Sequence, residues 1–155
     1  MRTAALLLLI ITIFISSSAY SEQKSTGIGL ISGEPTGVSF KFHQSRNTAI
    51  AGAIAWSFVD DSSLHVHADW LTHNWTYLKD TFEVKSGELP LYYGIGGRVL
   101  FDDDTRLGAR FVIGMSYIFE DAPFDLFLEA APVLDVIPKT TVGFNSAIGV
   151  RYWID

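Results

Sequence analysis

The chain contains no cysteine among its 155 residues. It therefore has no disulfide framework, no thiol chemistry and no cysteine for attaching a lipid. Positive charge is also scarce, because 11 Lys and Arg stand against 17 Asp and Glu for a formal net charge of −6. An acidic chain of this kind is not expected to bind nucleic acid.

Long hydrophobic runs are almost absent as well. One apolar run, Ala4–Ile15, follows a positively charged start and leads into a small-residue segment that ends at Ala19. This pattern is typical of a secretory signal peptide, and the run is too short to span a membrane as a helix. We therefore expect residues 1–19 to be a cleaved signal and residues 20–155 to form one exported domain without a linker.

The exported part alternates between two unlike kinds of side chain. Large apolar residues occupy every second position of the clearest segment: Leu107, Ala109, Phe111, Ile113, Met115, Tyr117 and Phe119. Small or charged residues, Arg106 and Arg110 among them, lie between these positions. A period of two predicts a β-strand with two different faces. The same period predicts eight strands, near residues 26–31, 38–43, 49–58, 64–70, 89–101, 106–119, 124–131 and 142–154.

The size of the side chains on the two faces decides which face points outward. An eight-stranded barrel has an interior only just wide enough for side chains to fill, so its many large apolar residues do not fit inside. The other face is a poor water-exposed surface, because in one strand it consists of Ala49, Ala51, Ala53, Ala55 and a serine. The sequence therefore predicts an all-β, eight-stranded, antiparallel up-and-down transmembrane barrel with large residues facing lipid.

Short polar segments with turn chemistry separate most of these strands. One connection is longer and extends from about Trp75 to Gly87. Within it, Thr81–Val84 is predicted to extend a hairpin. If both chain ends face the periplasm, this longest connection also lies on the periplasmic side.

Three segments carry a resemblance to a known family: Leu89–Arg98 (LPLYYGIGGR), Ala131–Thr140 (APVLDVIPKT) and Gly149–Trp153 (GVRYW). They resemble a family of small bacterial outer-membrane barrels that is similar to the transmembrane domains of OmpA and OmpX. The resemblance extends over roughly residues 27–154. It implies an eight-stranded barrel in the bacterial outer membrane, surrounded by membrane lipid, and it supplies no catalytic residues.

The end of the chain looks like the assembly signal of outer-membrane proteins. Gly149, Tyr152 and Ile154 have the expected spacing. Two positions depart from the pattern, because Ala147 replaces a polar residue and Asp155 follows the last apolar position. The resemblance implies the outer-membrane assembly machinery as a partner.

Six charged residues share the inner face of the predicted barrel: Asp69, Arg98, Arg110, Asp125, Glu129 and Arg151. Buried charges need partners, because an isolated one costs several kcal/mol. We expect these side chains to form a structural network that fills the lumen. They lack a nucleophile and so do not form a catalytic set.

Two histidines, His65 and His67, are candidate metal ligands on the same inner face. Residues two apart on a strand lie about 6.5–7 Å from each other, so both side chains must lean together to share an ion. The simpler interpretation is that they join the hydrogen-bonded interior. No cofactor is expected.

The sequence shows no catalytic constellation either. Three inward-facing serines, Ser39, Ser57 and Ser116, lie on different strands, and none forms a defensible pair with a histidine. We therefore expect a non-enzymatic outer-membrane barrel with a structural or surface-interaction role and an unknown surface ligand. Two alternatives stay open: a soluble periplasmic, lipocalin-like barrel that binds an apolar ligand, and a narrow pore.

Overall fold

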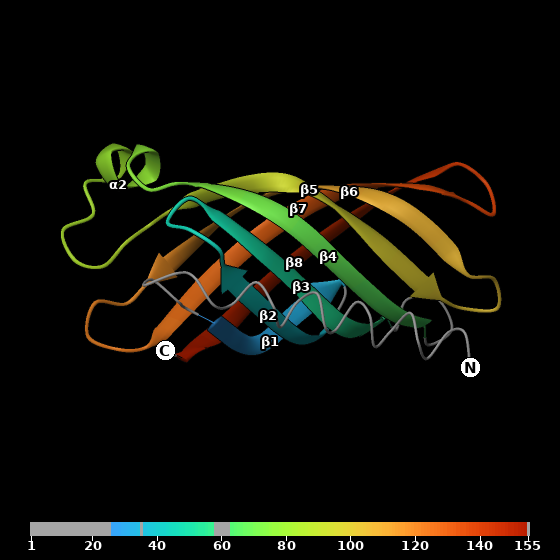
Figure 1. The fold of residues 1–155 in the computed structure, drawn as a ribbon, viewed down its shortest axis with the longest axis horizontal. Helices are drawn as coiled ribbons and strands as arrows, with labels where there is room; N and C mark the ends of the chain where they lie inside the picture. The colour runs from blue at the N-terminus through green and yellow to red at the C-terminus, as the bar shows by residue number, and fades with distance from the viewer. Residues whose placement is uncertain (1–25, 35, 58–62, 155) are drawn as a thin grey trace.

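Eight antiparallel strands close into a barrel in which each strand pairs with its neighbours in sequence (Figure 1). The computed structural model describes residues 26–34, 36–57 and 63–154. The strands are β1 (Thr26–Glu34), β2 (Thr36–His43), β3 (Thr48–Ser57), β4 (Ser63–Asn74), β5 (Leu91–Phe101), β6 (Arg106–Ile118), β7 (Phe124–Ile137) and β8 (Thr141–Ile154). The expected fold class is therefore confirmed. The expected signal peptide at residues 1–19 lies outside the described residues.

Pairing of the first and last strands closes the wall. It begins at Thr26↔Ile154 and ends at Glu34↔Ser146. The barrel end at which β8 finishes is named the C-terminal rim below, and the other end the opposite rim. Because the strands alternate in direction, every second connection lies at the same rim. Among the described residues, no helix has the length and apolar character needed to cross a bilayer.

The long connection between β4 and β5 differs from the expectation. It contains a short helix, α2 (Tyr77–Thr81), which lies at the same end of the barrel as the C-terminus in Figure 1. The predicted hairpin extension at Thr81–Val84 is therefore wrong. The Asn74 side-chain oxygen accepts hydrogen bonds from two backbone N–H groups at the start of the helix, at 3.1 and 2.9 Å. Leu78, a residue of the helix, is buried. The hydrogen bonds to Asn74 and the packing of Leu78 favour a helical turn over strand continuation.

Strand β7 is longer than the alternation indicated. The predicted strand at residues 124–131 continues to Ile137, through Pro132. Proline has no N–H to donate to a ladder. No β6 partner is assigned to Pro132, since pairing passes from Arg110↔Val133 to Ile113↔Ala130. The proline therefore occupies a gap in the β6–β7 ladder.

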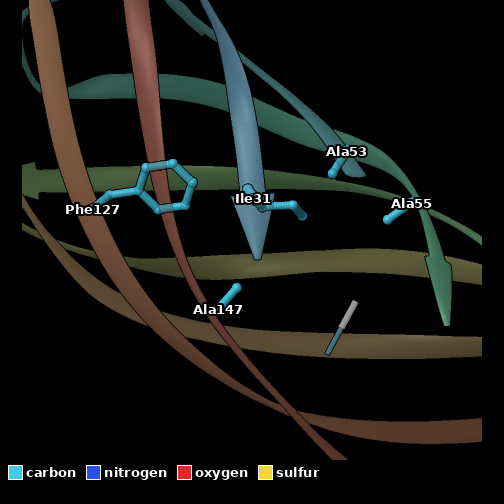
Figure 2. Close-up of a cluster of buried hydrophobic side chains, with 5 residues drawn as sticks. All are labelled: Ile31, Ala53, Ala55, Phe127 and Ala147. Atoms are coloured by element: carbon cyan, nitrogen blue, oxygen red, sulfur yellow. The ribbon is translucent and has the colours of Figure 1, made fainter. Parts of the chain in front are cut away.

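The two faces of the wall differ as the size argument predicts. The four β3 alanines are buried, whereas Ile54, Trp56, Phe111 and many other large apolar side chains are exposed on the outside. Figure 2 shows one apolar layer of the interior, formed by Ile31, Ala53, Ala55, Phe127 and Ala147 from four strands. Small residues on the inner face leave room for the few large and charged side chains that share it.

Candidate functional site

Arg110 of β6 is the centre of the polar interior. Its Nε lies 3.0 Å from Asp69 Oδ1 of β4, and its Nη1 donates to Asn145 Oδ1 of β8 at 3.0 Å. Its Nη2 lies 3.7 Å from Glu129 Oε1 of β7. Asp69 also lies 3.7 Å from His67 Nε2. One guanidinium group thus joins four strands across the lumen.

A second pair lies nearer the opposite rim. Arg98 of β5 binds Asp135 of β7 in a bidentate arrangement, with Nε–Oδ1 at 3.1 Å and Nη2–Oδ2 at 2.7 Å. This geometry is the strong form of an arginine–carboxylate contact. Arg98 Nη1 also donates to Asn145 Oδ1 at 3.4 Å, so Asn145 links this pair to Arg110.

A third pair lies toward the C-terminal rim. Arg151 of β8 donates from Nε to Asp125 Oδ1 of β7 at 3.3 Å. Its guanidinium carbon lies 3.8 Å from the centre of the Phe127 ring, within the range of a cation–π contact. Both charged side chains are almost fully buried.

Lys41 and Tyr92 extend the network around Arg110 through Glu129. The Lys41 ammonium lies 4.3 Å from the centre of the Tyr92 ring. The Tyr92 hydroxyl donates to Glu129 Oε2 at 2.9 Å. Glu129 therefore binds both a phenol and the central guanidinium group of Arg110.

The contacts across the lumen pass over glycines. Gly96 pairs with Asp69 on one side and with Arg110 on the other, so the ion pair forms above a residue without a side chain. Gly108 stands in the same way between Arg98 and Asp135, and Gly114 between Tyr92 and Glu129. A Cβ at Gly96 or Gly108 would collide with the carboxylate beside it. The inner-face glycines therefore determine which side chains can meet.

Aromatic rings and histidines occupy the lumen at the C-terminal rim. The His43 ring lies 4.8 Å from that of His73 and 5.5 Å from that of Trp153, measured between centroids. His73 also stacks on Trp75 at 5.9 Å. The Trp75 Nε1 group donates to the Arg46 carbonyl at 2.8 Å, which ties this ring to the β2–β3 turn.

The buried charges balance. Among the described residues, the buried charged side chains are four cations and three carboxylates, and the partly buried Glu129 adds a fourth carboxylate. The cations are Lys41, Arg98, Arg110 and Arg151, and the carboxylates are Asp69, Asp125, Glu129 and Asp135. Removing one member of these pairs would leave a charge without water and without a counter-ion, which is costly.

A cavity of about 200 Å³ lies at the opposite rim. Its lining includes Ser63, His65, Arg98, Leu100, Arg106 and Asp135, together with Glu34 and the first residues of β8, Thr141–Asn145. Below it lie the central ion pairs and the fully buried ring of Tyr92. This cavity is named the vestibule below.

The structure places all six predicted charged residues inside the barrel. It brings Arg110 together with Asp69 and Glu129, and Arg151 together with Asp125. It does not pair Arg98 with any of the six. The partner of Arg98 is Asp135, which lies beyond residue 131, the predicted end of its strand.

Four further members of the network were not predicted: Lys41, Tyr92, Asp135 and Asn145. Lys41 and Tyr92 stand on the inner face by parity, so alternation alone places them in the lumen. Asp135 has the same parity as Asp125 and follows from continuing the alternation along β7. Asn145 is uncharged, and nothing in the local sequence marks it as the link between two arginines.

The two candidate metal ligands lie side by side. His67 Nδ1 lies 3.2 Å from His65 Nε2, within hydrogen-bond distance, and the tautomers of the two rings decide which nitrogen donates. His67 also faces Asp69, and His65 lines the vestibule. Within the described part of the chain, no group of three His, Cys, Asp or Glu side chains is arranged to hold a metal ion.

Comparisons with known proteins give a fold but no family by sequence. No protein-family model and no curated protein sequence matches the chain. The N-terminal β-barrel domain of Pseudomonas aeruginosa OprF is similar in structure, with a TM-score of 0.61 over 85% of this chain and 100% of that domain, at 12% identity. Neisserial surface protein A is also found, with a TM-score of 0.49, 13% identity and coverage of 83% and 93%. The OmpA-like eight-stranded barrel expected from the resemblance is thus confirmed as the fold of this chain.

Proposed function

We propose that this chain is an integral protein of the bacterial outer membrane, with a closed interior and a structural or surface-interaction role rather than a catalytic one. The observation that carries the proposal is the inversion of the two faces. Charged side chains are buried inside, and large apolar side chains such as Phe111, Leu128 and Ile148 are more than half exposed outside. A soluble protein would not leave such a belt in water.

The ends of the belt also fit a bilayer. Aromatic side chains gather on the outer surface near the C-terminal rim, including Tyr117, Phe119, Phe124 and Tyr152, and Trp56 lies near the opposite rim. Aromatic girdles at both interfaces are characteristic of membrane barrels. The proposed partners are therefore membrane lipid and, through the chain end with Gly149, Tyr152 and Ile154, the outer-membrane assembly machinery. The C-terminal rim would face the periplasm.

The soluble, ligand-carrying alternative requires an apolar cavity, which does not fit the interior seen here. The cavity of about 200 Å³ has a mixed lining that includes Arg98, Arg106 and Asp135, and it opens at one rim. The deeper interior is occupied by paired charges and by Tyr92, Phe127 and Leu71. An apolar ligand would have to displace these side chains.

The narrow-pore alternative is favoured by one observation, the vestibule that enters the lumen from the opposite rim. Ions would then have to pass Arg110, Tyr92 and the histidine–tryptophan cluster at the C-terminal rim. We propose that these side chains block the path. Planar-bilayer recordings on the purified barrel should therefore show no steady ion conductance.

The first experiment is gel mobility of the outer-membrane fraction with and without boiling. A barrel with paired strands resists detergent until heated, so the unboiled sample should migrate differently from the boiled one. Recovery of the chain in the soluble periplasmic fraction, with no mobility shift, would overturn the membrane assignment. A mobility shift together with steady conductance would keep the membrane assignment and replace the closed interior by a pore.

A further inference from the structure

Two histidine rings meet inside the barrel on the side of the opposite rim. His65 and His67 stand two residues apart on β4, and both side chains are buried. The ring planes are nearly perpendicular, at 75°, so the rings do not stack. Their facing nitrogens, His65 Nε2 and His67 Nδ1, lie 3.2 Å apart. The two side chains therefore lean together, as two residues on one strand must do to share an ion.

The distance between the facing nitrogens is close to that in a metal site. Two imidazole nitrogens that each lie about 2.0–2.1 Å from a tetrahedral zinc ion are about 3.3–3.4 Å from each other. The 3.2 Å between His65 Nε2 and His67 Nδ1 is only slightly shorter. A small rotation of the two rings therefore directs both nitrogens at one ion, without a change in the strand.

Asp69 favours the tautomer of His67 that a metal requires. Its Oδ2 lies 3.7 Å from His67 Nε2, the ring nitrogen that does not face His65. A carboxylate there favours a proton on Nε2 and leaves a lone pair on Nδ1. Metal-binding histidines are commonly oriented by a carboxylate in this way. Without metal, His65 Nε2–H donates to this lone pair. On metal binding that proton moves to His65 Nδ1, so no net proton is released.

The charges beside the histidine pair favour a cation. Arg98 is already held by Asp135, and Arg110 by Asp69 and Glu129. The described charged residues that contact the two histidines or line the spaces beside them are four carboxylates, Glu34, Asp69, Glu129 and Asp135, and three guanidinium groups, Arg98, Arg106 and Arg110. Four negative and three positive charges leave one negative charge in excess within this set.

The vestibule supplies a route and the remaining ligands. His65 belongs to the lining of this cavity of about 200 Å³, which has room for water. Zinc takes four ligands, and the described part of the chain arranges no third His, Cys, Asp or Glu side chain with these two. Water from the vestibule therefore completes the tetrahedron. A site with two open positions binds its ion less tightly than a closed structural site.

We propose that His65 and His67 form a binding site for a divalent transition-metal ion of the zinc class at the floor of the vestibule. The two imidazole nitrogens are the protein ligands, and Asp69 orients His67. Imidazole suits zinc, copper and nickel, whereas magnesium and calcium prefer oxygen ligands. The site goes beyond the proposed structural role and does not depend on it, because its ligands and its cavity belong to the barrel alone.

The test uses the full chain folded in detergent micelles and zinc chloride as the probe. Isothermal titration calorimetry should show one zinc ion per barrel, with a dissociation constant in the micromolar range. An excess of magnesium should not displace the zinc. Cobalt(II) in place of zinc should give the intense visible absorption of a tetrahedral site.

Matched variants locate the site. Loss of an outer-shell partner alone weakens metal binding about 10–100-fold, so His65→Gln and His67→Gln should each weaken zinc binding at least about tenfold. The controls His43→Gln and His73→Gln alter the histidine pair at the C-terminal rim and should bind zinc within about twofold of the parent. Every variant should keep the heat-dependent gel shift. If a variant does not fold, X-ray absorption at the zinc edge of the parent chain still tests for two imidazole ligands.

Some results would overturn the proposal. These are no zinc binding at millimolar concentration, equal binding by the parent and by His65→Gln and His67→Gln, or an absorption spectrum with oxygen ligands alone. Loss of zinc binding only in the His43 or His73 variant would place the ion at the C-terminal rim and refute the proposed pair. A normal gel shift without zinc binding would refute the metal site and leave the membrane barrel in place.

Discussion

Breaking the central ion pair should destabilise the barrel, and the cost should depend on which partner is removed. In Arg110→Met, Asp69 and Glu129 lose their shared cation while remaining inside the barrel. In Asp69→Asn, Arg110 loses its nearest carboxylate but keeps Glu129 at 3.7 Å and Asn145. The first variant should therefore be the less stable of the two.

The magnitude follows from the distances. At 3.0 Å between Arg110 Nε and Asp69 Oδ1, an effective dielectric constant of about 20 gives an attraction of about 5 kcal/mol. Removing one member of a buried pair costs about 3–5 kcal/mol, because the remaining charge is stranded. We expect about 4 kcal/mol for Arg110→Met and about 2–3 kcal/mol for Asp69→Asn, since the remaining partners compensate in the second case.

The double variant gives the decisive comparison. Arg110→Met combined with Asp69→Asn restores the balance between cations and carboxylates. Its loss of unfolding free energy should be smaller than the sum of the two single losses by about 2 kcal/mol, a coupling typical of residues in one network. The assay is urea unfolding of the barrel in lipid vesicles, followed by tryptophan fluorescence and by the heat-dependent gel shift. At about 1–3 kcal/mol per M urea, the single variants should lower the midpoint by about 0.7–4 M.

A purely additive double variant would refute this reasoning. Additivity would mean that Arg110 and Asp69 contribute independently, so the 3.0 Å contact would have no energetic role. Unchanged midpoints in both single variants would mean that water reaches these groups and that the interior is not closed. In that case the bilayer recordings should show conductance in the parent chain.

Three smaller predictions use the same unfolding assay. Gly96→Ala should destabilise the barrel by about 1–3 kcal/mol, since its Cβ would collide with the Asp69 carboxylate. Gly97→Ala should be neutral, because the nearest atom would be 3.7 Å away. Equal effects would contradict the conclusion that the Asp69–Arg110 contact requires a glycine at position 96. Ile113→Arg, which places a charge on an outward residue that is 54% exposed, should cost about 2–4 kcal/mol in lipid vesicles, and no cost there would argue against lipid contact. Tyr92→Phe removes a hydroxyl that donates to a carboxylate at 2.9 Å and should cost about 1–3 kcal/mol, so an unchanged midpoint would show that this hydrogen bond is replaceable.

Features that depend on consecutive residues were predicted correctly, and features that depend on contacts elsewhere in the chain were not. The strands and their facing were predictable, because alternation is written in consecutive residues and each strand repeats it. The helix at Tyr77–Thr81 was missed, because the conformation of this connection depends on the hydrogen bonds that Asn74 accepts and on burial of Leu78. The predicted strand stopped at residue 131, and only the structure shows that β7 continues because Pro132, which has no N–H to donate, occupies a gap of the ladder.

The sequence likewise predicts one part of the candidate site, the face on which its residues lie, but not their pairing. Parity placed the six charged residues on the inner face, but parity does not say which strands bring them level with one another. The register of each ladder decides that Gly96 stands between Asp69 and Arg110, and that Gly108 stands between Arg98 and Asp135. The inner-face glycines were visible in the sequence, yet their role appears only once the registers are known.

The sequence by itself determined that this chain forms a small barrel with its apolar face outward. The reason is that every strand by itself shows the period of two and the small inward residues, so this result does not depend on which strands pair. Only the tertiary structure decided how the charges pair, because Arg110 and Asp69 are 41 residues apart and meet through two consecutive ladders. It also decided where β1 ends relative to β8, because their pairing stops at Glu34↔Ser146 although β8 begins at Thr141. The register of each strand depends on the lengths of all the strands and turns around the barrel. These features therefore arise from the closed barrel and not from any single segment.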